Sequence, residues 1–474
     1  MNQRRGRQCG MLAFAVLPLA ACVTPPPEEP FQDPADPVRA ADQIPKPEDS
    51  LRSENGGQEA AQAEGDDGQA DGPRGGSEAA PAERADGAEQ ADGAEQPSGA
   101  VHADLSAAAD SGPRDQAAAD GNGAVSEAAI DAVMERMTLR QRIGQRFISF
   151  VPGTRLRDGA HEIIRTVAPA GFIVYPWNFE SLQEARVLIN TLQFVAAADQ
   201  PGVSLFIAAD QEGGRVRAIR FPEFVTLPSA AVIGSLNDPQ AVGAAAYLNS
   251  RQLRTIGVNM NFAPVLDLFS GAEESIIGDR SFGADPLAVS RFVRPYLDAS
   301  RSAGVIATAK HFPGHGVTTV DSHIELPVVR MSWNELATGP LVPFVTAVQH
   351  NVPAIMTAHL VFADIDPDYP VTISEVFMHD ILRGELGYDG VVVTDGLEMG
   401  AMSDNFDLET TLIRLFRYDV DLILLYTRYD VIEVVETVER LVHEGEITVE
   451  DIDRGVRRVL RLKGRYGLLA PGAQ

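Results

Sequence analysis

The chain has 474 residues and carries 67 acidic against 39 basic side chains, a formal net charge of −28. Because nucleic-acid binding needs a basic face that neutralises phosphates, this charge excludes nucleic acid as the expected partner. The two cysteines are Cys9 and Cys22, and Cys9 lies in a segment that we expect to be removed. A mature chain with one cysteine forms no intramolecular disulfide.

Residues 1–22 resemble a bacterial lipoprotein signal. Three arginines near the start precede an apolar core, Met11–Leu19, which is too short to span a bilayer. Small residues then lead into Cys22. The resemblance implies that Cys22 is lipidated and tethers a periplasmic protein to the membrane. An ordinary cleaved signal with a chance cysteine is the alternative.

Residues 23–125 have the composition of a disordered acidic linker. They carry 23 acidic and 6 basic side chains, so they account for −17 of the chain's −28. The hexamer Ala-Asp-Gly-Ala-Glu-Gln occurs twice in tandem at 85–96. Such a segment buries too little apolar surface to offset its ordering entropy, which predicts a self-repelling spacer. A protein-binding role for it is the alternative.

Residues 126–474 are expected to form one domain of alternating strands and helices. Several apolar runs lack two-residue alternation, which is typical of strands buried on both faces. The expected strands are Phe147–Phe150, Gly171–Tyr175, Leu205–Asp210, Val258–Val265, Val305–His311, Ala354–His359, Val391–Asp395 and Leu422–Tyr426. The expected helices include Ser181–Ala198, Asp238–Thr255, Asp285–Ala303, Trp333–Gln349 and Asp451–Tyr466. Eight βα units predict a TIM-type (β/α)8 barrel, with an open doubly wound sheet as the alternative.

Polar side chains follow nearly every expected strand, as at Asp210, Lys310, His359 and Asp395. Buried polar groups are costly unless they are paired. Their coincidence at the carboxyl ends of the strands is explained by one convergent site on the top face of a barrel. This placement favours the barrel over the open sheet.

The densest polar run is Lys310–His323, which holds three of the chain's nine histidines. A loop rich in histidine by chance is the bland alternative. His311 and His315 have a spacing that suits zinc on a helix, but Pro313 and Gly314 between them break one. We therefore expect no metal in this run.

Four motifs in order give the chain a specific resemblance. They are D-Q-E-G-G-R-V at 210–216, R-S-F-G-A-D-P at 280–286, K-H-F-P-G-H-G-V-T-T-V-D-S-H at 310–323 and V-T-D-G-L-E-M at 393–399. Together they are similar to glycoside hydrolase family 3, in its β-N-acetylhexosaminidase branch, over residues 130–470. The resemblance implies hydrolysis of β-linked sugars with retention, through a covalent glycosyl-enzyme intermediate and without a cofactor.

The resemblance also implies the catalytic residues. Asp395 would be the nucleophile, and His323, oriented by Asp321, would be the acid/base. The chemistry is reasonable, because imidazole titrates near neutrality and a neighbouring carboxylate favours its protonated form. From the residues alone, Asp395 could equally be the N-cap of a following helix. Gly396 is expected to leave room beside the nucleophile.

The same resemblance implies that five side chains grip the sugar, namely Asp210, Arg215, Arg280, Lys310 and His311. Forked arginines and carboxylates suit a polyol. This sequence departs from the family pattern where many members carry a second arginine. It has Ala218 there, with Arg217 and Arg220 beside it. One sugar contact is therefore open.

Loop motion is expected around the acid/base, because Gly314 and Gly316 could let the loop carry His323 in and out. The chain ends soon after its last expected helix, so we expect no second domain and take the acid/base from the barrel itself.

Several functions stay open at this point. The favoured one is a retaining exo-β-N-acetylglucosaminidase acting on peptidoglycan fragments, as a monomer. The alternatives are a β-N-acetylglucosaminide phosphorylase, a β-glucosidase or β-xylosidase of the same family, and a non-catalytic tethered barrel that binds glycan.

Overall fold

The computed structural model describes residues 125–153, 159–200, 202–269, 271 and 275–469. The predicted signal, the lipidation site Cys22 and all but the last residue of the predicted acidic linker lie outside these residues. Within the described part of the chain, no helix is both long and apolar enough to cross a membrane.

Eight parallel strands close into a barrel, which confirms the predicted (β/α)8 fold. Their order around the barrel is β1-β12-β11-β9-β7-β6-β3-β2, with β2 returning to β1. Six of them fall within the predicted strand runs, and β7 and β11 each extend one residue beyond theirs, to Phe312 and Gly396. Their bounds are β1 Phe147–Phe150, β2 Gly171–Ile173, β3 Phe206–Ala209, β6 Met260–Asn261, β7 Ile306–Phe312, β9 Ala354–Thr357, β11 Val391–Gly396 and β12 Leu422–Leu424.

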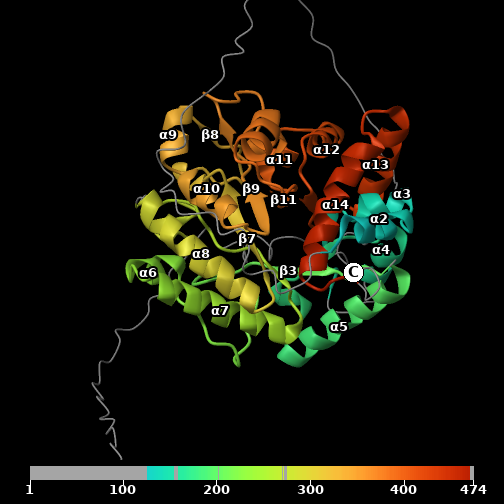
Figure 1. Ribbon diagram of the computed structural model, residues 1–474, viewed down its shortest axis with the longest axis horizontal. Helices are drawn as coiled ribbons and strands as arrows, with labels where there is room; N and C mark the ends of the chain where they lie inside the picture. Colours follow the sequence, from blue (N-terminus) through green and yellow to red (C-terminus); the bar gives the residue numbers. More distant parts are fainter. Residues whose placement is uncertain (1–124, 154–158, 201, 270, 272–274, 470–474) are drawn as a thin grey trace, which may run out of the picture. The chain divides into compact units, whose positions relative to one another are not determined.

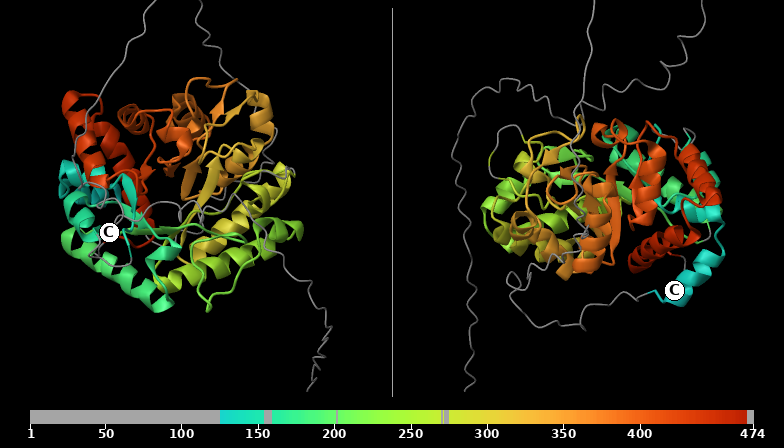
Figure 2. Two further views of the ribbon diagram at one scale, coloured as in Figure 1. Left: turned by 180° about the vertical axis from the view of Figure 1, so that it is seen from behind. Right: turned by 90° about the horizontal axis from the view of Figure 1, so that it is seen from above.

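Helices surround the strands on the outside (Figure 1), and the two further views show the same ring from behind and from above (Figure 2). They are α2 Glu127–Glu135, α3 Leu139–Gly144, α4 Ala160–Val167, α5 Leu182–Asp199, α6 Ala230–Ser235, α7 Pro239–Ile256, α8 Pro286–Ser302, α9 Trp333–Thr338, α10 Val342–Gln349, α11 Gly400–Ser403, α12 Leu408–Arg417, α13 Val431–Glu444 and α14 Val449–Arg465. Short helical turns are η2 Pro176–Asn178, η3 Gly278–Arg280, η4 His315–Val317, η5 Val371–Ile373 and the π-helical η6 Val376–Glu385. Four short strands lie outside the barrel: β4 Gln211–Gly213, β5 Val216–Arg217, β8 Val328–Val329 and β10 Val361–Phe362.

The helix starts follow from capping side chains. Asp285 accepts from the amides of Leu287 and Ala288 at the start of α8, and Thr448 accepts from Asp451 at the start of α14. One helix prediction was wrong, because Trp333–Gln349 forms two helices, α9 and α10. The break falls at Gly339 and Pro340, since proline lacks an amide proton and disfavours helical backbone in the residue before it.

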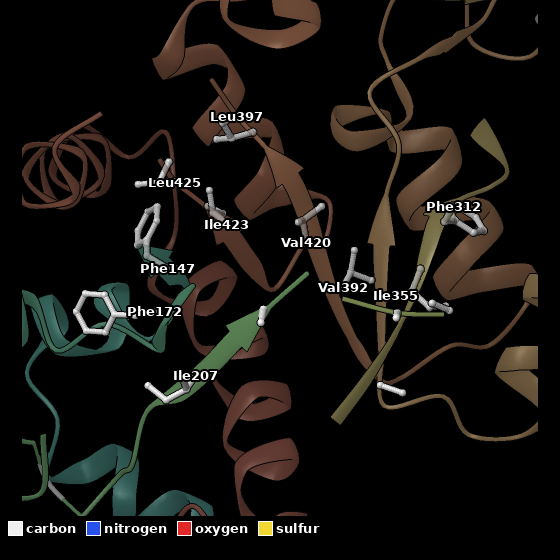
Figure 3. Packing of buried hydrophobic residues seen from close by; sticks show 14 of the residues in the cluster. Phe147, Phe172, Ile207, Phe312, Ile355, Val392, Leu397, Val420, Ile423 and Leu425 are labelled. Atoms are coloured by element: carbon white, nitrogen blue, oxygen red, sulfur yellow. The ribbon is translucent and has the colours of Figure 1, made fainter. Parts of the chain in front are cut away.

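The strands of the barrel are buried on both faces, so apolar side chains form one layer outside the barrel and another inside it. Side chains such as Phe172, Ile207 and Ile423 point outward and pack under the helices (Figure 3). Alternate residues such as Phe206 and Leu424 fill the interior, where α14 also contributes side chains. This two-sided burial explains why the strands read as continuous apolar runs.

Two barrel strands are irregular. The register of β7 shifts between Ala309 and Phe312, and that of β11 shifts between Val393 and Gly396. In β11 the hydroxyl of Thr394 accepts the amide of Leu424 at 3.0 Å, in place of a backbone carbonyl. Such bulges re-aim side chains, and these two fall where the predicted site residues lie.

Candidate active site

The predicted site residues lie on the face of the barrel formed by the carboxyl ends of its strands. They come from strand ends and from the segments that follow them: Asp210 after β3, Arg280 at the end of η3, Lys310 and His311 in β7, Asp321 and His323 after η4, and Asp395 in β11. The structure therefore brings residues from distant parts of the sequence to one mouth.

A buried ion cluster forms one wall of this mouth. Lys310 Nζ lies 2.7 Å from both Asp210 Oδ1 and Glu212 Oε1. Arg280 forms a fork with Glu212, at 2.8 and 2.9 Å. Burial raises the pKa of Glu212, but the charges of Arg280 and Lys310 outweigh this and lower it to about 2. Glu212 thus holds both cations in place, while Asp210 stays 27% exposed and open to a ligand.

Arg215, predicted to bind sugar, contacts the segment that leads into Arg280. Its guanidinium lies 3.1 Å from Asp279 and donates to the carbonyl of Ile276 at 2.6 Å. These partners belong to the segment that leads into Arg280. Arg215 therefore supports this segment, and a direct contact with sugar is not needed to explain it.

Asp395 lies in β11 and is not a helix N-cap, so that alternative is wrong. The next helix, α11, starts five residues later, with Met399 at its N-cap position. Asp395 Oδ1 accepts from the amide of Gly396 at 2.8 Å, and Oδ2 lies 4.0 Å from His311 Nε2. Burial raises the pKa of Asp395, but neighbouring histidines and Lys310 outweigh it and lower the pKa to about 2. The carboxylate is ionised and can act as a nucleophile.

Gly396 does not leave open room beside the nucleophile. A Cβ at this position would lie 2.2 Å from a ring carbon of Tyr426. The space that glycine provides is therefore filled by an aromatic side chain, and this close contact fixes the backbone after Asp395.

A buried Asp–His pair stands behind Asp395. The carboxylate of Asp267, which is fully buried, lies 2.6 Å from His311 Nδ1 and accepts from the backbone amides of His311 and His315. Arg280, which can only donate, lies 3.4 Å from His311 Nε2. These contacts fit the tautomer in which Nδ1 carries the proton and donates it to Asp267. Asp267 thus sets the orientation of His311.

The second Asp–His pair is the predicted acid/base. Asp321 Oδ1 lies 2.8 Å from His323 Nδ1 and accepts from the backbone amide of His323 at 2.9 Å. Burial lowers the pKa of His323, but the hydrogen bond to Asp321 and the charge of Asp395 outweigh it, so the pKa is raised. The side chain of His323 is 51% exposed. Its outer nitrogen can therefore exchange a proton with a substrate at neutral pH.

The segment carrying this pair is docked against α11. The amide of Gly400 donates to the carbonyl of His323 at 3.0 Å, and the amide of Ala401 donates to that of Ser322 at 3.1 Å. Because α11 closely follows β11, this contact brings the predicted acid/base to the side of the barrel face that holds Asp395.

The two glycines expected to permit loop motion are closely packed. A Cβ at Gly316 would lie 1.7 Å from the carbonyl oxygen of Leu268, and one at Gly314, where φ is +134°, would lie 2.6 Å from Pro340. Close approach of neighbouring backbone explains both glycines without a hinge.

Comparison with known proteins agrees with this geometry. Residues 138–462 match the Glycosyl hydrolase family 3 N terminal domain. The chain belongs to glycosyl hydrolase family 3. A protein named beta-hexosaminidase from Alkalilimnicola ehrlichii is 36% identical over 290 residues, which cover 60% of this chain and 81% of that protein. The family predicted from the four motifs is thereby confirmed.

Solved family 3 structures have the same barrel. The β-N-acetylglucosaminidase of Paenibacillus sp. FPU-7 superposes with a TM-score of 0.68 at 37% identity. The match covers 70% of this chain and 63% of that one, so this chain spans less than two thirds of its length. The β-N-acetylhexosaminidase of Beutenbergia cavernae gives a TM-score of 0.64 at 26% identity, covering 69% of this chain and 99% of that one.

The family 3 site also contains residues to which the sequence assigned no role. Glu212 holds Lys310 and Arg280, and Asp267 holds His311, as described above. His359 lies fully buried, with Nε2 3.0 Å from the carbonyl oxygen of Gly396 and Nδ1 2.7 Å from Thr372 Oγ1. It therefore fixes the backbone that follows Asp395. The sequence pattern could have indicated all three, since each is a polar residue at or near the end of a strand.

His315 contacts the segment that carries Asp321 and His323. Its Nε2 lies 3.1 Å from the hydroxyl of Ser322, the residue between Asp321 and His323. Burial and the nearby His311 lower the pKa of His315 to about 4, so its ring is neutral at physiological pH. Among the described residues, no group of three histidine, cysteine or acidic side chains is arranged to hold a metal ion.

Ala218 is buried, and its amide donates to the carbonyl of Asp210 at 2.8 Å. Of its neighbours, Arg217 donates to Thr226 and Arg220 donates to the carbonyl of Arg217. Neither arginine is recorded in contact with the ion cluster. The structure therefore offers no replacement for the family arginine from these two residues in their present positions.

Proposed function

We propose that this family 3 protein is a retaining exo-β-N-acetylglucosaminidase, which removes a terminal β-linked N-acetylhexosamine through a covalent glycosyl-enzyme intermediate. The observation that carries the proposal is the presence, at one mouth, of an ionised Asp395 and a half-exposed His323 with a raised pKa. The names of the relatives, beta-hexosaminidase and β-N-acetylglucosaminidase, support the same substrate class.

In the first step, a carboxylate oxygen of Asp395 attacks the anomeric carbon and the bond to the leaving oxygen breaks. His323, protonated on Nε2, gives that proton to the leaving oxygen. Asp321 stays hydrogen-bonded to Nδ1 and keeps the ring in position. The products of this step are a glycosyl ester on Asp395 and the freed aglycone.

In the second step, water attacks the anomeric carbon and breaks the ester bond to Asp395. His323, now neutral, takes a proton from the water and returns to its starting state. Each step inverts the anomeric centre, so the product keeps the β configuration. Asp210, Lys310 and Arg280 would bind the hydroxyl and acetamido groups of the terminal sugar.

The test is hydrolysis of an aryl β-N-acetylglucosaminide and an aryl β-glucoside by wild type, Asp395→Ala and His323→Ala. We expect wild type to prefer the N-acetylated substrate and Asp395→Ala to lose on the order of 10⁴-fold or more in kcat. If folded wild type cleaves neither substrate, the proposed enzymatic function is wrong. If Asp395→Ala is fully active, Asp395 is not the nucleophile.

Azide separates the two roles. In Asp395→Ala a small anion can take the place of the missing carboxylate, so we expect an α-glycosyl azide. In His323→Ala the covalent intermediate still forms and azide replaces water, so we expect a β-glycosyl azide. The opposite anomers would exchange the two assignments.

Phosphate tests the main alternative. A histidine acid/base, which is neutral when the second step begins, repels an incoming anion less than a carboxylate would, and this keeps phosphorolysis open. Sugar phosphate formed only when phosphate is added would replace hydrolysis with phosphorolysis as the function.

We also propose that the protein is lipidated at Cys22, works in the bacterial periplasm and acts there on peptidoglycan fragments. Only the sequence of residues 1–22 and the acidic linker support this location. Cys22→Ala should release the protein from membranes on fractionation, and a variant that stays membrane-bound would contradict the lipid anchor.

A further inference from the structure

The two halves of the barrel mouth differ in chemistry. The ion cluster occupies the sector of β3, β6 and β7, whereas aromatic side chains occupy the sector of β12, β1 and β2. Tyr426 follows β12 and Tyr175 follows β2, and their ring centroids lie 5.6 Å apart. Phe150, at the end of β1, packs in the same cluster. Nothing in the chemistry proposed for the terminal sugar uses this aromatic half.

The aromatic row begins at the nucleophile. As described above, the ring of Tyr426 fills the space beside Gly396, the residue after Asp395. Tyr175 lies next to Tyr426, and Trp177 stacks on Tyr175 with a centroid distance of 4.3 Å and an interplanar angle of 11°. The row therefore leads from the reacting centre to the rim of the barrel.

Trp177 is exposed and yet held in a fixed position. Its side chain is 44% exposed, although its ring stacks on Tyr175. The side chain of Asn178 accepts from the amide of Tyr175 at 2.8 Å and donates to the carbonyls of Val151 and Gly153. These bonds fix the short turn η2 that carries Trp177. A rigid indole with free surface at the mouth of a sugar site can stack on a ligand without a large entropy loss.

Two oxygens beside this row have no hydrogen-bond partner among the described residues, although both are buried. They are the hydroxyl of Tyr175 and Oε2 of Glu398. The other oxygen of Glu398 accepts from the amide of Tyr426. Burial raises the pKa of Glu398 to about 7, so near neutrality this carboxyl group can also donate. Buried polar groups are usually paired, so these two oxygens leave hydrogen-bonding capacity unused beside the aromatic row.

We propose that Trp177, stacked on Tyr175, is the platform for the sugar on the leaving-group side of the scissile bond. The proposal rests on the function proposed above, in which the terminal sugar sits between the ion cluster and Asp395. The C–H groups of a pyranose face carry partial positive charge, and the face of an indole carries partial negative charge, so the two attract. The ligand class is therefore a β-linked oligosaccharide of N-acetylated hexosamines.

Fluorescence provides a direct binding test, because the chain has two tryptophans, Trp177 and Trp333. In a Trp333→Phe, Asp395→Asn variant, Trp177 is the single reporter and the ligand is not cleaved. Titration with the β-1,4-linked trimer of N-acetylglucosamine should shift and saturate the emission. The monosaccharide, which fills only the terminal-sugar site, should not. An emission unchanged by the trimer would overturn the proposal.

Kinetics provide the second test. Trp177→Ala should lower kcat/KM for the trimer about three- to tenfold, the range expected for one aromatic stacking contact, and Trp177→Phe should recover part of the loss. The inhibition constant of N-acetylglucosamine should not change, since it reports the terminal-sugar site. Phe194→Ala, which removes an aromatic ring that is 74% exposed on α5, is the control and should behave as wild type.

The outcomes separate this proposal from the function beneath it. Equal kcat/KM for wild type and Trp177→Ala on the trimer, with normal cleavage, overturns the platform and leaves the enzyme intact. Absence of all cleavage by wild type overturns the function, while the fluorescence titration still decides whether Trp177 binds the oligosaccharide.

Discussion

Two Asp–His pairs lie in the same mouth and have nearly the same geometry, yet their surroundings differ. The Asp267–His311 pair, at 2.6 Å, is almost entirely buried, with side chains 0% and 7% exposed. The Asp321–His323 pair, at 2.8 Å, has side chains 26% and 51% exposed. Burial makes the first pair a fixed support, whereas exposure lets the second exchange protons. The same two residue types thus acquire different roles from solvent access.

The largest expected effect is on the exposed pair. His323→Ala should lower kcat by about 10²- to 10⁴-fold, because it removes the proton donor. The melting temperature should stay near that of wild type, since the side chain is half exposed. The matched control is His379→Ala, because His379 is also exposed and lies 2.9 Å from its neighbour Asp380. An equal loss in both variants would contradict the assignment.

Substitution in the buried Asp267–His311 pair should change the stability of the fold. Asp267→Asn should lower the free energy of unfolding by about 1–3 kcal/mol, because an amide cannot accept from all the donors that now face the carboxylate. Urea denaturation measures this change. Asp321→Asn, at the exposed pair, should cost less, in the range of about 0–1 kcal/mol typical of exposed ion pairs. Equal losses would erase the distinction between the pairs.

The stabilising effect of Asp267 should also depend on pH. Burial raises its pKa, but His311 and His315 outweigh this, so the folded pKa is lowered. A lowered carboxylate pKa stabilises the fold above the unfolded value of about 3.9 and loses that effect as pH falls through the folded pKa. The gap in stability between wild type and Asp267→Asn should therefore shrink in acid below about pH 4.

The smallest expected effect is a shift of the pH–rate profile. Asp395 has a pKa of about 2 and stays ionised across the assay range. Activity should therefore fall on the alkaline side, as pH rises through the raised pKa of His323. Asp321→Asn removes the hydrogen-bonded charge that raises this pKa, so the alkaline limb of kcat/KM should move to lower pH. If the alkaline limb does not move in Asp321→Asn, a group other than His323 causes it.

The sequence was sufficient for the architecture, and it also supplied the candidates for the reacting groups. Eight apolar runs with polar ends predicted the barrel, because hydrophobic pattern is a local property of each strand. The Asp395 and His323 positions came from motif resemblance, and the structure brings both to one mouth. The helix break at Pro340 was missed, although it could have been predicted, since proline acts on its own neighbours.

The contacts between these side chains could not be predicted from the sequence, because they depend on how the barrel closes. His311 is 44 residues from Asp267, and Lys310 is 100 residues from Asp210. Arg215 forms an ion pair with Asp279, and the ring of Tyr426 fills the space beside Gly396. In each case the sequence shows the type of residue, and only the structure shows the residue that it contacts.

The amino-acid sequence by itself therefore determined the barrel and the candidates for the reacting residues, since both depend on short segments. Only the tertiary structure decided which Asp–His pair is buried and which faces solvent. Burial is a property of the closed barrel and its packed segments, and it gives two similar pairs different access to solvent.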